Sequence, residues 1–132
     1  MRYLFDTNVW IDLERGSYSH VLDRASSCTR DQVGVSTVVL GELYAGALQS
    51  MDPIRARRSI DTFLAGWPRI GVDERTAEIY AEIRAALQSQ GRVIGPNDLW
   101  IAAQALREDV VLVTANDDEF SRVPSLEVEN WR

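Results

Sequence analysis

The first sixteen residues, MRYLFDTNVWIDLERG (residues 1–16), join a short apolar run to an acid and then to a helical pattern. Arg2–Phe5 predicts a buried strand, because bulky apolar side chains follow one another there. Thr7–Glu14 has apolar residues at helical spacing, and Gly16 ends the pattern. A strand that leads directly into a helix indicates an α/β fold. Asp6 stands between the two elements, where it either caps the helix or holds a metal ion.

The rest of the chain repeats this alternation of short strands and helices. Further strands are predicted at Val33–Val35, Arg69–Val72, Val110–Val113 and Leu126–Glu129. Further helices are predicted at Ser17–Ser26, Ser36–Ser50 with Ser36 as N-cap, Pro53–Ala65, Asp73–Gln90 and Pro96–Glu108. The continuous apolar run Val110–Val113 is typical of a parallel sheet interior. The pattern predicts one domain over residues 1–132, a three-layer α/β/α sandwich around a central, mostly parallel sheet.

Composition limits the classes of partner. The chain has 20 acids against 14 bases and a net charge of −6, and every base is an arginine. A protein that coats nucleic acid is basic, so a nucleic-acid partner must be held here through a local patch or a bound cation. The single cysteine, Cys28, excludes an internal disulfide and predicts a cytoplasmic protein. No run approaches the ~20 apolar residues of a membrane span, so we expect no membrane association and no signal peptide.

Acidic residues recur near the ends of the predicted strands. Asp6 follows the first strand, and Asp98 lies in the first turn of the helix that leads to Val110–Val113. Glu42 lies between apolar residues of the helix after the second strand, and an acidic segment, Thr114–Glu119, follows Val110–Val113. Sites in open parallel sheets form at the carboxyl ends of the strands. Carboxylates that converge there repel one another and raise one another's pKa values, which a divalent cation would relieve.

Each of these acids also has an ordinary explanation. Asp6 is a suitable N-cap, and Asp98 is favoured in the first turn by the helix dipole. Glu42 in mid-helix would usually face solvent, and the acids of Thr114–Glu119 would form a solvated turn. Their combined spacing is what favours a shared site. Carboxylate oxygens suit Mg²⁺ or Mn²⁺, whereas zinc is disfavoured in a chain with one His and one Cys.

Four blocks of the sequence resemble a known family. They are LFDTNVWIDL (residues 4–13), STVVLGELYAGAL (36–48), NDLWIAAQALREDVVLVTANDDEFSRV (97–123) and LEVENW (126–131). Together they resemble PIN-domain ribonucleases of the VapC toxin type, in the right order and over nearly the whole chain. The resemblance implies the PIN fold and an Mg²⁺-dependent endoribonuclease, with Mn²⁺ as a substitute. It also implies the toxic component of a type II toxin–antitoxin pair.

The resemblance assigns roles to individual residues. Asp6, Glu42 and Asp98 match the family's first three metal-binding acids. The fourth acidic position falls in Thr114–Glu119, where many relatives have Asp and this chain has Asn116. Asn116 could still supply an uncharged amide oxygen there, and Asp117 and Glu119 are the alternatives for the acidic role, so the resemblance leaves the three residues open for this position. Thr114 matches a position that often supports the site by hydrogen bonding.

The resemblance also implies partners. They are a cognate antitoxin, whose C-terminal segment lies over a groove and blocks the site, a second copy of the chain in a homodimer, and an RNA substrate, either tRNA or rRNA. The densest basic cluster consists of Arg55, Arg57 and Arg58, and Arg92 precedes the Asp98 helix. Arginine binds phosphate bidentately, so these residues are candidates for RNA binding, with a solvated helix face as the alternative for the cluster.

Other functions remain to be weighed. Asp6 at a strand end could be a phosphoacceptor, as in haloacid-dehalogenase-type phosphatases or response-regulator receivers. Those families need a lysine, which this chain lacks, and the phosphatase motif needs an acid where this chain has Asn8. A non-catalytic PIN-fold binding module, with its fourth acid lost at Asn116, is the main alternative to the ribonuclease. A DNA-directed PIN nuclease is a further one.

Overall fold

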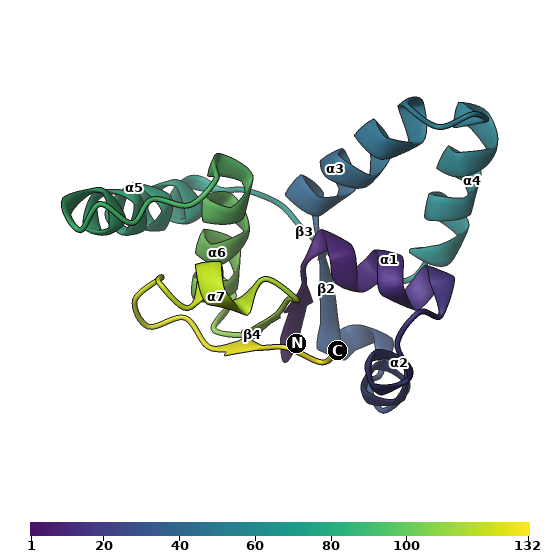
Figure 1. The fold of residues 1–132 in the computed structure, drawn as a ribbon, viewed down its shortest axis with the longest axis horizontal. Helices are drawn as coiled ribbons and strands as arrows, with labels where there is room; N and C mark the ends of the chain where they lie inside the picture. The colour runs from purple at the N-terminus through teal and green to yellow at the C-terminus, as the bar shows by residue number, and fades with distance from the viewer.

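The computed structural model describes residues 1–132, and Figure 1 shows them as one sheet with helices on both sides. The strands are β1 (Tyr3–Phe5), β2 (Val33–Ser36), β3 (Arg69–Ile70), β4 (Val111–Val113) and β5 (Val128–Glu129). The helices are α1 (Thr7–Arg15), α2 (Ser19–Ser26), α3 (Thr37–Leu48), α4 (Pro53–Phe63), α5 (Glu74–Ser89), α6 (Pro96–Glu108) and α7 (Asp117–Phe120). A 3₁₀ turn, η1 (Arg30–Gln32), precedes β2. None of these helices combines the length and the hydropathy of a membrane span.

The strand order places the ends of β1 and β4 side by side. The order is β3-β2-β1-β4-β5, and all four pairings are parallel. From β1 the chain builds outward to β2 and β3, and then crosses to the other side of β1 to form β4 and β5. The order therefore reverses between β1 and β4, which is the position where open parallel sheets form their sites.

The core lies around these two central strands. Leu4, Phe5, Leu112 and Val113 are fully buried, as expected for parallel strands that are covered on both faces. Figure 1 shows α1 and α4 on one side of the strands and α5 and α6 on the other. The helices thus bury both faces of the sheet and leave its carboxyl edge open to receive side chains.

Aromatic side chains fix α1 and the end of the chain against the sheet. The ring of Phe5 lies 5.1 Å from that of Trp10 and 5.2 Å from that of Trp131. Trp10 in turn packs edge-on against Trp67, at 5.3 Å. Such tilted and edge-to-face pairs add about 0.5–1.5 kcal/mol each beyond their buried area. Trp10 and Trp131 are therefore core residues.

The α/β/α fold class predicted from the sequence is confirmed, and the elements differ at their ends. The strand predicted at Arg69–Val72 stops at Ile70, because side chains from α6 take the next carbonyl groups: Gln104 donates to the oxygen of Ile70 and Arg107 to that of Gly71. The predicted turn over residues 117–119 is instead the start of α7, which the fully buried Phe120 anchors to the core.

Candidate metal centre

Asp6 occupies the reversal point of the sheet. It lies between the last residue of β1 and the first of α1, and only 7% of it is exposed. Its Oδ1 accepts a 2.8 Å hydrogen bond from the backbone N–H of Thr7, and its Oδ2 accepts a 2.9 Å bond from the hydroxyl of Thr114, directly after β4. Asp6 therefore caps α1, and the same contacts fix its carboxylate at the junction of the central strands.

Glu42 of α3 reaches the same edge. The hydroxyl of Thr7 donates a 2.8 Å hydrogen bond to Glu42 Oε1. Glu42 is half-buried, and this contact turns its carboxylate toward the strand ends. A solvent-facing position, the ordinary explanation for a mid-helix Glu, does not describe this residue.

Asp98 lies in the first turn of α6, among the other acids. Its pKa is raised to about 6, first by burial and then by the negative charges of Asp6, Glu119 and Glu42. A first-turn carboxylate is normally stabilised by the helix dipole, so the upward shift means that desolvation and like charge outweigh that effect here. Four carboxylates thus gather at one edge of the sheet.

Within the acidic segment after β4, Glu119 is the residue whose charge acts on Asp98. Asn116 donates from its side-chain amide to Glu119, and the charge of Glu119 contributes to the pKa shift of Asp98. Asp117 instead accepts a 3.1 Å hydrogen bond from Asn130, and its charge does not contribute to that shift. Asp117 and Glu119 are two residues apart in the one-turn helix α7, so their side chains point in different directions.

Hydrogen bonds link the acidic side chains into a continuous path. The backbone N–H of Asn116 donates to the hydroxyl oxygen of Thr114, which closes the last gap. The path runs through Glu42, Thr7, Asp6, Thr114, Asn116 and Glu119. Hydrogen bonding therefore orients three of the four carboxylates through their neighbours.

The donor set fits a hard divalent cation. The site consists of carboxylate and amide oxygens, the ligands that Mg²⁺ and Mn²⁺ prefer, and like charges at Asp98 are not balanced by a base. As the side chains stand, no three acidic, His or Cys groups converge closely enough to chelate one ion.

Comparison with known proteins agrees with this geometry. A family model described as the PIN domain matches residues 3–126. The chain belongs to the PIN domain family.

Relatives of this PIN domain carry the name VapC. Ribonuclease VapC2 of Rickettsia felis is 34% identical over 134 residues, which cover 99% of this chain and 98% of that protein. The tRNA(fMet)-specific endonuclease VapC of Salmonella typhimurium is 30% identical over 131 residues, with the same coverage. The structure of DNA-bound VapBC from Salmonella typhimurium matches with a TM-score of 0.93 and 30% identity, covering 100% of this chain and 99% of that one. Within its family, this PIN domain belongs with the VapC proteins.

The arginines proposed to bind RNA differ in their contacts. In this PIN domain Arg57 lies 3.7 Å from the ring of Tyr44 and forms a 3.1 Å ion pair with Asp61. Arg55 and Arg58 are exposed along a shallow hollow of about 380 Å³ on α4. Arg92 is exposed in the loop before α6. Arg55, Arg58 and Arg92 thus have guanidinium groups available, whereas that of Arg57 is already engaged.

A groove of about 330 Å³ leads away from the acidic edge of the PIN domain. It begins at Thr7 and Glu42 and continues between α1, α3 and α4. Its apolar lining consists of Ile11, Leu43, Ala47, Ala56 and Ile60. A ligand in this groove would therefore lie against Glu42.

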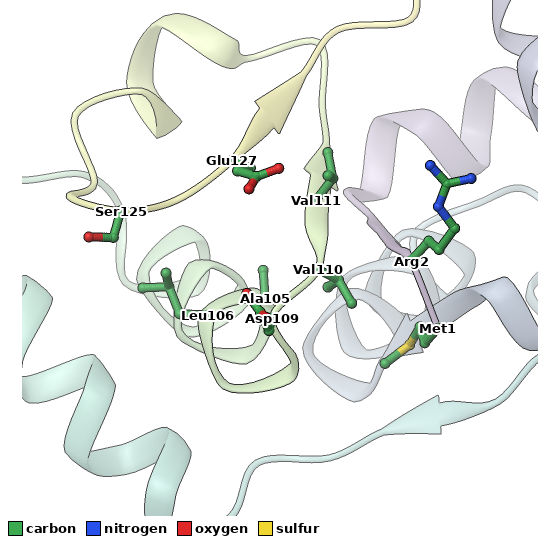
Figure 2. Close-up of a pocket in the computed structure, with 9 residues that line it drawn as sticks. All are labelled: Met1, Arg2, Ala105, Leu106, Asp109, Val110, Val111, Ser125 and Glu127. Atoms are coloured by element: carbon green, nitrogen blue, oxygen red, sulfur yellow. The ribbon is translucent and has the colours of Figure 1, made fainter.

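Another hollow lies at the opposite end of the strands. It has a volume of about 240 Å³, and Figure 2 shows Val110 and Val111 at the start of β4, with Leu106 of α6 and Glu127 around them. None of the acids predicted to form the site lines it. The hollow is therefore separate from the candidate acids at the carboxyl ends of the strands.

Two side-chain contacts in and beside the acidic cluster could not be predicted from the sequence. Thr7 was noted there only as the start of a helix, and Asn130 only within the block LEVENW, yet they contact Glu42 and Asp117, respectively. Both pairs are distant in sequence, and no periodicity reports such pairs. The one hint in the sequence is that Thr7 directly follows Asp6. The first residue of a helix lies beside its N-cap, so Thr7 had to lie at the same end of the strands as Asp6.

Proposed function

We propose that this PIN domain is a metal-dependent endoribonuclease, the toxic component of a type II toxin–antitoxin pair. The observation that carries the proposal is the setting of Asp98, whose pKa of about 6 reflects burial beside Asp6, Glu42 and Glu119. Repulsion within such a cluster of acids destabilises the fold unless a cation balances the charge. Strongly shifted pKa values of this kind gather at functional sites. The names of the VapC relatives, a ribonuclease and a tRNA endonuclease, support RNA as the substrate.

The cation is Mg²⁺, for which Mn²⁺ substitutes. Asp6, Glu42 and Asp98 would hold it, with the fourth position taken by Glu119 rather than Asn116 or Asp117. When bound, a cation of this kind lowers the pKa of water and neutralises charge on a phosphodiester. The hydrogen bonds from Thr7 and Thr114 keep the Asp6 carboxylate oriented, since each of its oxygens accepts one of them.

The protein's own charges shape the approach of RNA. The net charge is −6, so the acidic edge repels a phosphate backbone until its charge is neutralised. Arg55, Arg58 and Arg92 are the arginines that remain available for phosphate, which they bind in a bidentate manner. We expect an unpaired segment of tRNA or rRNA, because proteins read RNA sequence in loops and ends.

The groove between α1, α3 and α4 is the proposed docking site of the antitoxin. It has an apolar floor and ends at Glu42, so an occupant would cover one of the acids. Leu48, Met51 and Ile54, at the α3–α4 turn, are also exposed, and their burial is a further source of affinity. VapC relatives have been solved as VapBC complexes. We also propose that the toxin forms a homodimer, which sedimentation of the purified chain would test.

The direct test is cleavage of defined RNA by the purified chain. Initiator tRNA, bulk tRNA and ribosomal RNA would each be incubated with the protein and Mg²⁺, and the ends of the products sequenced. We expect discrete cleavage in one of them, leaving a 5′-phosphate and a 3′-hydroxyl, and complete loss of cleavage in excess EDTA. Cleavage that persists in EDTA would contradict the metal-dependent mechanism. A protein that binds its antitoxin and RNA but neither binds Mn²⁺ nor cleaves would be the non-catalytic PIN module.

A further inference from the structure

We propose that Thr7 is a positioning residue that fixes Glu42 relative to Asp6. The inference rests on the proposed function, because it concerns the residues of the same metal centre. Thr7 contacts both acids with different groups: its backbone N–H donates to Asp6 Oδ1 and its hydroxyl donates to Glu42 Oε1, each over 2.8 Å. One residue thus joins a carboxylate at the end of β1 to a carboxylate in the middle of α3.

The backbone contact places Thr7 rigidly. As the first residue of α1, it follows its N-cap directly, and that cap is 7% exposed. The hydroxyl of Thr7 therefore starts from a position set by β1, and its single proton is committed to Glu42.

Glu42 depends on this contact more than Asp6 does. Both oxygens of Asp6 accept hydrogen bonds, from Thr7 and Thr114. For Glu42 the hydroxyl of Thr7 is the one hydrogen-bond donor from the protein, and a Glu side chain has many rotamers open to it when nothing holds it. Without the Thr7 hydroxyl, Glu42 would turn among other rotamers over the half-open groove.

Residues that orient a metal ligand typically change metal affinity or activity by about 10–100-fold when they are replaced. Thr7→Val keeps the β-branched shape and the backbone donor and removes only the hydroxyl. Thr7→Ser keeps the hydroxyl and removes a methyl group. The two variants therefore separate the hydrogen bond from the packing of the side chain.

The experiment measures the Kd for Mn²⁺ of the purified, metal-free protein by titration calorimetry, together with kcat and KM on the RNA that the wild type cleaves. We expect Thr7→Val to raise the Kd by about 10-fold or more and to lower kcat while KM for RNA stays within about 2-fold. Thr7→Ser should remain within about 3-fold of the wild type. Thr37→Val is the matched control, because Thr37 is the exposed first residue of α3 and its hydroxyl has no partner in the protein.

A double-mutant cycle with Glu42→Ala tests whether Thr7 acts through Glu42. In the Glu42→Ala background, the additional Thr7→Val change should alter the Kd by less than about 2-fold, because the partner is already gone. A Thr7→Val protein with the wild-type Kd and kcat, or one that loses only thermal stability, overturns the inference. If the wild type binds Mn²⁺ and cleaves no RNA, the endoribonuclease proposal falls, while the comparison of Mn²⁺ affinities still decides the role of Thr7.

Discussion

The hydroxyl of Thr114 donates a 2.9 Å hydrogen bond to Asp6 Oδ2, across 108 positions of sequence. The bond ties the end of β4 to the end of β1, and it is fully buried. The same hydroxyl oxygen accepts from the backbone N–H of Asn116. The Thr114 side chain therefore contacts both Asp6 and the segment that carries Glu119, and helps to orient each of them.

Asp6→Asn and Asp98→Asn should each lower RNA cleavage by more than about 100-fold while the fold remains intact, because each removes a charged ligand and keeps its size. The measurement is the single-turnover rate in Mg²⁺, with circular dichroism as the check on folding. Asp23→Asn, on the exposed face of α2, is the control and should retain the wild-type rate. Full activity in either site variant would remove that residue from the mechanism.

Glu119→Gln should lower cleavage strongly, by about 10-fold or more, whereas Asp117→Asn should change it by less than about 3-fold. The reason is that Glu119 adds to the field at Asp98, while Asp117 is paired with Asn130. The two acids lie in the same short helix, so each variant controls for the other's effect on α7. The reverse ranking would assign the fourth position to Asp117.

Asp98→Asn should raise the melting temperature of the metal-free protein at pH 7.5. The pKa of Asp98 is raised to about 6 from 3.8, so the folded state binds this proton more tightly than the unfolded state does. Stability from this group is therefore present at low pH and declines as the pH rises from about 4 to about 6.

The advantage of Asp98→Asn should accordingly shrink as the pH falls from about 6 to about 4, because the wild-type carboxyl of the folded state takes up its proton over this range. Differential scanning calorimetry in EDTA across pH 4–8 gives both curves. Adding Mg²⁺ at pH 7.5 should stabilise the wild type more than the variant. A variant that is less stable than the wild type at pH 7.5 in EDTA would show that repulsion does not dominate at Asp98.

Arg132→Ala should lower the free energy of unfolding by about 1–3 kcal/mol, because it leaves a buried carboxylate unpaired. Arg132 forms two hydrogen bonds, of 2.8 and 3.0 Å, with Asp12, whose side chain is 6% exposed. The estimate is below that for a fully buried pair, since 36% of the Arg132 side chain is exposed. Urea denaturation measures the loss, and Asp12→Asn combined with Arg132→Ala should recover part of it.

The alternation of strands and helices could be predicted from the sequence because it depends on local patterns of apolar residues. The apolar run that contains β4 and the helical spacing after Asp6 each report which side chains must be buried. Ser36 and Asp6 were expected to cap helices, and their side chains accept hydrogen bonds from the helix termini that follow. These features need no information from distant parts of the chain.

The ends of the elements were less predictable, because distant side chains decide them. The strand expected at Arg69–Val72 is shortened by two donors from α6, and the acidic turn becomes α7 because Phe120 enters the core. Neither event leaves a trace in the local pattern. The same holds for Asp117 and Glu119, which the sequence does not distinguish as candidates for the fourth acidic position. In α7 their side chains contact different residues, Asn130 and Asn116, respectively.

Apolar periodicity and the spacing of short motifs are local properties of the chain, so the fold class, the family resemblance and the candidate acids Asp6, Glu42 and Asp98 could be predicted without a structure. Which groups meet at the carboxyl ends of the strands depends on how the strands are ordered in space. The parallel order brings β1 beside β4, and with them Asp6 beside Thr114. The raised pKa of Asp98 and the hydrogen bond from Thr7 to Glu42 depend on that arrangement, because charge repulsion and hydrogen bonds depend on distances in space.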